Sequence, residues 1–192
     1  MCEQNGIEQR TDFRPTLNFY HQNAKGTGCA ARFELHPAHD RTDGSIFLTV
    51  ARQMTVGDRT GAQPTFARFD WANKIVVKLD FTDLSKMLMV FRGECESIED
   101  GKGLYHSAPN YSTRICLRHI VEPINGYSLE IYRTYKNASN TDAGGHIILY
   151  PHEALGLSES IAGSMAVISF GIPRVIPHDT SAYVAETRRC AG

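Results

Sequence analysis

The stretch from Phe69 to Gly93 most constrains the fold, because it reads as one strand that runs directly into one helix. Between residues 75 and 81, apolar side chains at every second position predict a strand with one apolar face and one mostly polar face. We expect Thr82 to cap the helix, Asp83 to add favourable negative charge at its N-terminus, and Gly93 to end it. The apolar stripe of this helix consists of Leu84, Met87, Leu88 and Phe91.

A second strand and helix with the same pattern lie near the C-terminus. Residues 146–150 read as a short apolar strand, and Pro151 suits the first turn of a helix. This helix is expected to run to about Phe170 before a glycine and a proline end it. Its apolar stripe consists of Ala154, Leu157, Ile161, Met165 and Ile168.

Strand-like segments precede each of these two units. Alternating runs cover 28–38, 45–53 and 66–69 before the first unit, and 103–108, 112–123 and 127–137 before the second. The Asn125-Gly126 pair between two alternating runs is a strong hairpin signal. The chain therefore repeats one order of elements, four strands followed by a helix. This order predicts an α+β fold with two antiparallel sheets and helices packed on their apolar faces.

The length of 192 residues fits one domain. Residues 1–16 and 177–192 lack a periodic apolar pattern and are predicted to be flexible tails, which leaves residues 17–176 as the domain. The N-terminus shows no signal peptide, membrane span or transit peptide. Five cysteines without a CxxC motif favour reduced thiols, and therefore a cytoplasmic protein.

Both predicted helices carry more apolar or small residues than one small domain needs. The first helix is apolar also at Met89 and Val90, beyond its stripe. In the second, Gly156, Ala162 and Gly163 are small enough for another helix to approach closely. We therefore predict a homo-oligomer formed through the helices, with a tetramer favoured.

Acidic and basic residues are concentrated in different segments of the chain, although the net charge is only −1. That total excludes a polycation that holds nucleic acid by bulk charge alone. Residues 83–101 hold five acidic and two basic side chains, whereas residues 102–136 hold five basic and two acidic ones, which gives +3. Tyrosines lie among these cations at 105, 111, 127, 132 and 135. Interleaved cations and aromatic rings are typical of proteins that bind single strands.

Three short motifs resemble the Whirly family of single-stranded-DNA-binding proteins. FDW at 69–71, leading into a strand and a Thr-capped helix, resembles the family's YDW segment. KGTGCAARFEL from Lys25 resembles its KGKAAL strand, and GYSLEIYRT with the strand and FGIP-ending helix that follow is similar to its second half. The resemblance covers roughly Tyr20 to Pro173. It implies a single-stranded nucleic-acid-binding fold that assembles as a tetramer through its helices. The absence of a transit peptide is more typical of a bacterial or phage relative than of the organellar members.

Strand alternation predicts which charged side chains face outward. Because Ile115 and Leu117 must take the core side of their strand, Arg114 and Arg118 face outward. By the same argument, Lys74 and Lys78 face outward on the strand that follows residue 73. Trp71, just before that strand, is interpreted as a packing anchor and not as a surface for bases.

In the strand after the Asn-Gly turn, Leu129 and Ile131 direct Tyr132 outward. Arg133 then points to the opposite face, where we expect it to snorkel at the strand end. The predicted single-stranded-DNA surface comprises Lys25, Lys74, Lys78, Arg114, Arg118 and Tyr132, with Tyr111 near its edge.

A metal site finds less support in the sequence. His36, His39 and Asp40 resemble a ligand cluster, but they lie at a strand end and no third ligand set with a known spacing follows. We predict neither a metal nor a cofactor.

The sequence gives even less support for a catalytic site. Cys116 with His106 and His119 could supply a nucleophile and a base, but no oxyanion motif supports them. Asp80 and Asp83 flank a helix start, where capping explains them better than nuclease chemistry. KGTG lacks the form of a phosphate-binding loop. The sequence therefore predicts that this protein is not an enzyme.

Two classes of function follow from the sequence. The first is single-stranded DNA binding with little sequence specificity, in replication, recombination or repair; RNA is the alternative ligand. The second is a protein-interaction or structural subunit that keeps the fold without binding nucleic acid. A salt titration separates them, because binding through phosphates weakens as salt rises.

Overall fold

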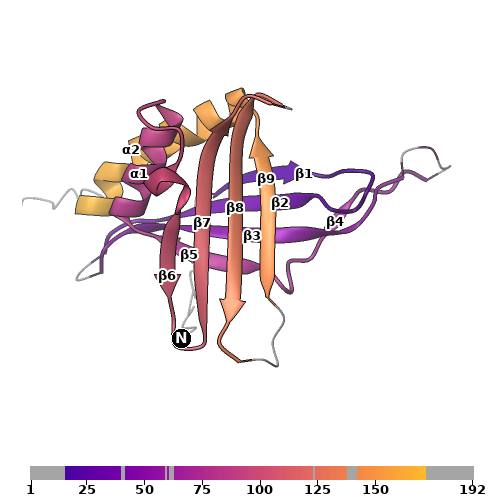
Figure 1. The fold of residues 1–192 in the computed structure, drawn as a ribbon, viewed down its shortest axis with the longest axis horizontal. Helices are drawn as coiled ribbons and strands as arrows, with labels where there is room; N and C mark the ends of the chain where they lie inside the picture. The colour runs from indigo at the N-terminus through magenta and orange to yellow at the C-terminus, as the bar shows by residue number, and fades with distance from the viewer. Residues whose placement is uncertain are drawn as a thin grey trace, which may run out of the picture.

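The structure is a computed structural model that describes residues 16–39, 42–58, 60, 63–122, 124–137 and 142–171. Over these residues the chain forms two antiparallel sheets and two long helices, which confirms the predicted α+β class (Figure 1). The predicted tail 177–192 lies outside the described residues, and so does the tail 1–16 apart from Thr16.

Sheet 1 contains five strands, one more than predicted. These are β1 (Thr16–His21), β2 (Cys29–His36), β3 (Ser45–Thr55), β4 (Arg68–Phe69) and β5 (Ile75–Leu79). They lie in the order β1-β2-β3, and β3 then pairs with β4 near its end and with β5 along its first half. The sequence prediction missed β1, a mostly exposed edge strand with too short an alternation to stand out.

Sheet 2 contains four strands in chain order, as predicted. These are β6 (Leu104–Ser107), β7 (Tyr111–Ile120), β8 (Gly126–Tyr135) and β9 (Ala143–Leu149). The Asn-Gly pair lies where β8 begins, so the predicted hairpin joins β7 to β8. All pairs in this sheet are antiparallel.

Helix α1 (Phe81–Phe91) starts one residue earlier than predicted, and its cap is not Thr82. The chain leaves β5 at once, so Asp80 becomes the N-cap. Its carboxylate accepts the backbone N–H of Asp83 at 2.9 Å, and the Asp83 carboxylate accepts the N–H of Asp80 at 3.2 Å. Two aspartates thus form a reciprocal capping box, which satisfies N–H groups that the helix cannot bond internally.

Helix α2 (Pro151–Phe170) follows β9 directly. Four of the five residues in its predicted stripe are buried, and Met165 is half-buried. The acidic connector after α1 contains a short 3₁₀ turn, η1 (Ile98–Gly101), where Glu99 forms an ion pair with Lys86 of α1. Both helices contact each other as well as sheet 2, and α2 packs on β8 and β9.

The strands of sheet 2 run across those of sheet 1, with β9 over β2 and β3 (Figure 1). Gly145 of β9 makes this crossing possible. A Cβ atom there would lie 2.4 Å from Cγ1 of Val50 and 3.0 Å from Sγ of Cys29. Beyond the crossing, the ends of β1 to β4 extend past β9, so part of sheet 1 has no second sheet on it (Figure 1).

Candidate nucleic-acid interface

The outer face of sheet 2 carries the side chains that strand alternation directs outward. Arg114 and Arg118 on β7 are exposed, whereas Ile115 and Leu117, which lie between them in the sequence, are buried. Tyr132 on β8 lies directly opposite Arg114, whose guanidinium carbon is 5.6 Å from the centre of the tyrosine ring. A cation and an aromatic ring therefore lie side by side on an exposed face.

Glu130 occupies the middle of this face and binds three neighbours. Its carboxylate accepts hydrogen bonds from the hydroxyl of Tyr132 at 2.7 Å and from Ser128 at 3.0 Å, and it forms an ion pair with Arg118 at 3.1 Å. Burial raises the pKa of Glu130, but these hydrogen bonds and the nearby positive charge outweigh burial, so the pKa lies below its usual range. The carboxylate is therefore ionised at neutral pH, and one of the two arginines on this face is already paired.

Ser128 and His146 lie next to Glu130 but do not form a catalytic pair. The hydroxyl of Ser128 donates its one proton to Glu130, so its 3.1 Å contact with Nε2 of His146 requires that nitrogen to be the donor. His146 in this tautomer cannot take a proton from Ser128, and Ser128 is buried. The arrangement fixes the position of the imidazole and does not activate the hydroxyl.

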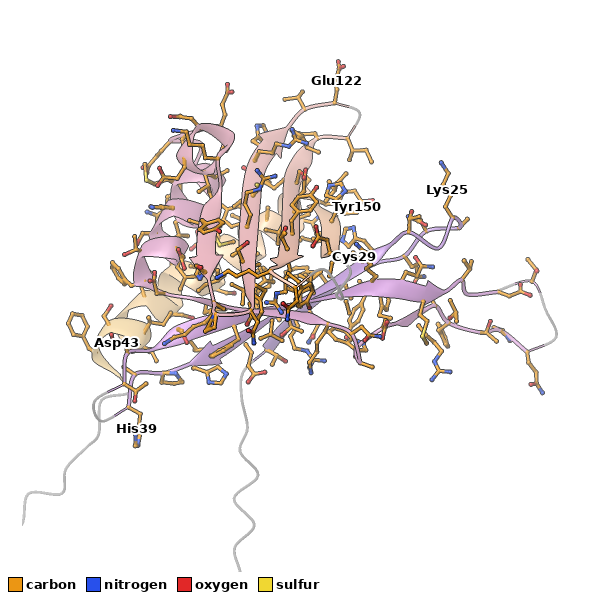
Figure 2. All side chains as sticks on the ribbon, turned by 60° about the horizontal axis from the view of Figure 1, so that its bottom comes forward. Lys25, Cys29, His39, Asp43, Glu122 and Tyr150 are labelled. Carbon is orange, nitrogen blue, oxygen red and sulfur yellow. The ribbon has the colours of Figure 1, made fainter. Side chains whose placement is uncertain are left out.

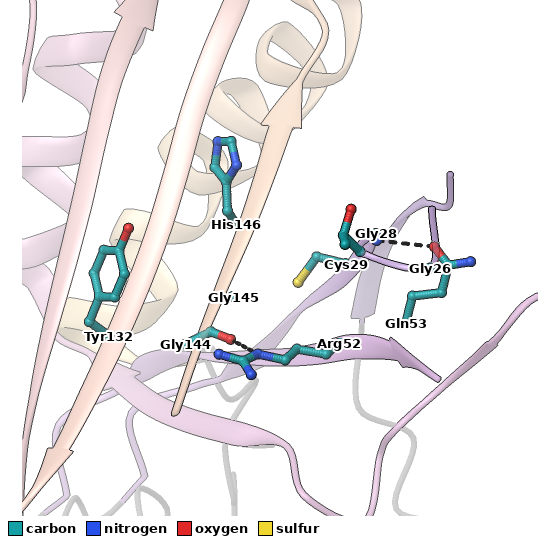
Figure 3. A pocket seen from close by; sticks show the side chains of 10 residues that line it. Gly26, Gly28, Cys29, Arg52, Gln53, Tyr132, Gly144, Gly145 and His146 are labelled. Carbon is teal, nitrogen blue, oxygen red and sulfur yellow. Dashed lines mark hydrogen bonds between the residues drawn. The ribbon is translucent and has the colours of Figure 1, made fainter. Parts of the chain in front are cut away.

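A cleft of about 420 Å³ separates this face from the extended end of sheet 1 (Figure 3). Tyr132 and His146 border it from sheet 2, and Arg52 and Gln53 from β3. Glycines supply much of the remaining wall, at 26, 28, 144 and 145. A Cβ atom at Gly28, Gly144 or Gly145 would come too close to neighbouring protein atoms, so these glycines let the segments around the cleft pack closely against one another.

Arg52 and Gln53 hold the two sides of the cleft in place. The Nε of Arg52 donates to the backbone carbonyl of Gly144 on β9 (Figure 3). The side-chain oxygen of Gln53 accepts the N–H groups of Asn23 at 2.9 Å and Gly28 at 3.1 Å, and this fixes the turn between β1 and β2. Lys25 lies at the tip of that turn, away from the helices, where its side chain is exposed (Figure 2).

Cys29 also borders the cleft, but its chemistry is that of a structural thiol. The side chain is buried, and burial raises its pKa to about 11. At neutral pH it is therefore a neutral thiol, and the thiolate is the form that attacks electrophiles or binds metals. Neither Cys29 nor Ser128 thus offers a nucleophile in this region.

The seven predicted contact residues divide among four places. Arg114, Arg118 and Tyr132 share the outer face of sheet 2, and Lys25 lies on the turn that borders the cleft. Two others, Lys74 and Lys78, are exposed on the opposite side, on the face of sheet 1 that points away from its buried residues. Tyr111 is half-buried at the start of β7, on the face of sheet 2 opposite Tyr132.

The prediction for Arg133 was wrong. It lies on the expected face but does not snorkel into solvent, because its side chain is only 9% exposed. Its guanidinium packs over the ring of Tyr111, with 4.1 Å between the guanidinium carbon and the ring centre. Tyr111 therefore contacts a buried arginine inside the protein.

The residues considered for metal binding or catalysis have structural partners. His36 lies 2.8 Å from the carboxylate of Glu34, and His106 lies 3.1 Å from that of Asp83. Asp40, the third residue of the suggested metal cluster, lies outside the described residues. Within the part of the chain that the structure describes, no three His, Cys, Asp or Glu side chains could share a metal ion, and no helix could span a membrane.

Sequence reasoning missed Arg52, Gln53 and His146 as members of the cleft. The Gly144-Gly145 pair was the available signal, because consecutive glycines inside a strand mark a close approach by another part of the protein. The sequence could not say which segment approaches them.

No protein-family model matches the chain, and no curated protein matches it in sequence. Its fold is similar to crystal structures of two proteins from Arabidopsis thaliana. WHY1 has a TM-score of 0.63 and 15% sequence identity, with 93% of each chain covered. WHY3 has a TM-score of 0.63 and 16% identity, with 93% of this chain and 97% of WHY3 covered. The protein therefore has a Whirly-like fold over most of its length.

Proposed function

We propose that this protein binds single-stranded DNA with little sequence specificity, along the outer face of sheet 2 and the cleft beside it. The observation that carries the proposal is the position of Tyr132, an exposed ring that borders the cleft and has Arg114 beside it. A base stacks on such a ring while the neighbouring cation contacts the phosphate backbone. The Whirly-like fold supports the proposal, because resemblance to that family implies single-stranded nucleic-acid binding.

The other groups around the cleft fit a ligand with a regular backbone and variable bases. Arg52 on β3 and Lys25 on the turn add positive charge on the side opposite Arg114. Stacking on Tyr132 needs only the flat face of a base, which all four bases possess. Duplex DNA keeps these faces stacked inside the helix, so the same ring has nothing to bind there. We therefore expect a preference for single strands without a strong sequence preference.

The test is a binding titration with a fluorescently labelled oligo-dT, followed by anisotropy at several salt concentrations. Affinity should fall as salt rises, with a slope of about 0.7 per phosphate contact. The duplex of the same length should bind much more weakly. A parent protein that binds neither, or binds equally well at low and high salt, would contradict the proposal and favour a structural or interaction role.

Two substitutions separate stacking from charge. Tyr132→Ala should weaken oligo-dT binding by about 1–3 kcal/mol and leave the salt slope unchanged, because stacking releases no counterions. Arg114→Ala together with Arg118→Ala should lower the slope by roughly one unit. Arg92→Gln serves as the matched control, since Arg92 is exposed at the end of α1.

We further propose that the protein assembles through its helices as a homo-oligomer, with a tetramer favoured. Leu155 of α2 is 63% exposed and Met89 of α1 is 44% exposed, and burial of such side chains favours association. Light scattering at micromolar concentration should give several times the 21.4 kDa of one chain. Leu155→Glu with Met89→Glu should reduce that mass, whereas a monomeric parent would contradict the proposal.

A further inference from the structure

Three aromatic side chains form a cluster on the face of sheet 1 that points away from the cleft. The ring centre of Tyr20 on β1 lies 5.6 Å from that of Phe69 on β4 and 6.5 Å from that of Trp71. Tyr20 is 52% exposed, and Phe69 and Trp71 are half-buried. The cluster therefore offers ring surface to solvent beside the edge of sheet 1.

A hollow of about 410 Å³ lies beside these rings. Gln22 and Arg68 border it together with the three aromatic side chains. The exposed Arg68 places a positive charge at the edge of the hollow. A ring surface beside a cation is the same combination that Tyr132 and Arg114 form on sheet 2.

The strand register places this hollow and the cleft on opposite faces of sheet 1. Across the sheet, Tyr20 pairs with Ala30, and the next row joins His21 to Cys29. Since neighbouring residues on a strand point to opposite faces, Tyr20 faces away from the side on which Cys29 borders the cleft. The turn between β1 and β2 touches both sites, through Gln22 at the hollow and Gly28 at the cleft.

Positive charge extends from the cluster across the same outer face. The guanidinium carbon of Arg32 on β2 lies 4.7 Å from the ring centre of Trp71. Lys78 is opposite Phe47 on β3, in the set of side chains that points away from the core. Lys74 lies just before β5, four residues or two strand repeats earlier, and is also exposed. Lys74 and Lys78, which lie far from the other predicted contact residues, are therefore on the same face as the aromatic cluster.

The acidic groups near the cluster already have partners. Both carboxylate oxygens of Asp70 accept hydrogen bonds from Asn73, and the carboxylate of Glu34 lies 2.8 Å from the imidazole of His36. The hydrogen bonds from Asn73 lower the pKa of Asp70, so its carboxylate stays ionised. The carboxylates of Asp70 and Glu34 are nevertheless outnumbered by the cations of this face, Arg32, Arg68, Lys74 and Lys78. The cations thus give the face a charge complementary to phosphate, and the rings give it a surface complementary to bases. A single-stranded nucleic acid has both features.

We propose that this outer face of sheet 1 is a second contact surface for single-stranded nucleic acid. Bases stack on Tyr20 and on the exposed part of Trp71, which the sequence indicates as a packing anchor and which is half-buried with Arg32 over its ring. Arg68, Lys74 and Lys78 contact phosphates. The proposal rests on the proposed function, because it extends the bound strand beyond the cleft. A strand that leaves the cleft reaches the second surface past the turn between β1 and β2, which borders both.

Trp71 provides a direct test, because it is the only tryptophan in the chain. Intrinsic tryptophan fluorescence of the parent protein should fall when a long unlabelled oligo-dT binds, since a base in contact with the indole quenches its emission. Labelled oligo-dT, followed by anisotropy in the same buffer, reports total binding independently. Binding without any change in Trp71 emission would overturn this proposal and leave the proposed function standing. If neither the fluorescence nor the anisotropy shows binding, both the second surface and the proposed function are contradicted.

Variants then test whether the quenching comes from this surface. Tyr20→Ala should weaken the binding that quenches Trp71 roughly fivefold or more, and Arg68→Gln should lower its salt slope by about 0.7. Arg92→Gln should change neither measurement. Tyr132→Ala should weaken binding but reach the parent's quenching at saturation. If Tyr20→Ala and Arg68→Gln both quench as the parent does, the second surface is wrong, and circular dichroism checks that each variant is folded.

Discussion

The guanidinium of Arg133 on β8 donates a hydrogen bond of 2.8 Å to the backbone carbonyl of Val76 on β5, so that one side chain joins the two sheets. Its Nε also donates to the hydroxyl of Thr113 at 3.0 Å. Because β5 is paired along β3 only, this contact supplies a partner to a carbonyl at the edge of sheet 1. Arg133 therefore acts as a structural residue in a region otherwise rich in candidate nucleic-acid contacts.

Arg133→Met should destabilise the protein by about 2–3 kcal/mol, because hydrogen bonds from a charged donor to buried acceptors are lost. Methionine retains most of the apolar length of the side chain, so the loss reports mainly the polar contacts. The free energy of unfolding in urea measures the effect. Arg114→Met is the matched control on an exposed arginine, and it should change stability by no more than about 0.5 kcal/mol. Equal effects of the two substitutions would show that Arg133 has no special role.

The ion pair between His106 on β6 and Asp83 on α1 should make stability depend on pH. The hydrogen bond to Asp83 raises the pKa of His106, against the opposing effect of burial. A raised pKa in the folded state gives stability that is fully present below the unfolded value of about 6.5 and is lost as pH rises through the folded value. The pair thus stabilises the protein most in mildly acidic solution.

The measurement compares the parent with His106→Gln by urea unfolding at about pH 6 and about pH 9. The parent should be more stable than the variant at the lower pH, and the difference should shrink at the higher pH. Asp83→Asn should remove the same pH dependence and add a loss that does not change with pH over this range, because the negative charge at the N-terminus of α1 is gone. A difference between parent and His106→Gln that is constant with pH would refute the linkage.

Most helices and strands could be predicted because their signals are local. The stripe of α2 needs only helical spacing, and the outward direction of Arg114 and Arg118 needs only alternation. Strand β1 was missed because its formation depends on pairing with β2, which no short segment encodes. The wrong helix cap has a similar cause: Thr82 and Asp80 are both good caps in isolation, and the end of β5 decides between them.

The site was less predictable than the fold, because it forms where distant segments cross. Arg52 and Gly144 are 92 residues apart in the sequence and meet only because β9 passes over β3. The angle and position of that crossing depend on packing of the two sheets, which alternation does not specify. For the same reason the sequence could place Lys74 on the outer face of one sheet and Tyr132 on the outer face of the other, but not show that these two faces point to opposite sides of the protein.

Gly145→Ala should destabilise the protein by about 1–3 kcal/mol, because the new methyl group would overlap Cγ1 of Val50 at the crossing. Val50→Ala in the same chain should recover part of this loss, since it removes the overlapping atom. The double-mutant cycle of unfolding free energies measures that coupling. If Gly145→Ala is as stable as the parent, β9 does not pass Val50 so closely.

Glu130→Gln should strengthen binding of oligo-dT. In the free protein the carboxylate holds Arg118 at 3.1 Å and competes with any phosphate for it. Its pKa lies below the usual range, so this competition persists throughout the neutral range. Glutamine carries no charge and keeps one oxygen, which can accept only one of the two hydroxyls, because Ser128 donates to Oε1 and Tyr132 to Oε2; the other hydroxyl would have to accept a hydrogen bond from the new amide NH₂. Freeing Arg118 should add about 0.7 to the salt slope.

The control for Glu130→Gln is the same substitution in an Arg118→Ala background. There the salt slope should not rise, because no arginine is released, although removal of one negative charge can still favour binding slightly at low salt. Anisotropy titrations at three or more salt concentrations give the slopes for all four proteins. Weaker binding by Glu130→Gln would mean that its main role is to hold the Tyr132 ring in place. An equal rise in slope in both backgrounds would show that Arg118 is not the cation that Glu130 withholds from phosphate.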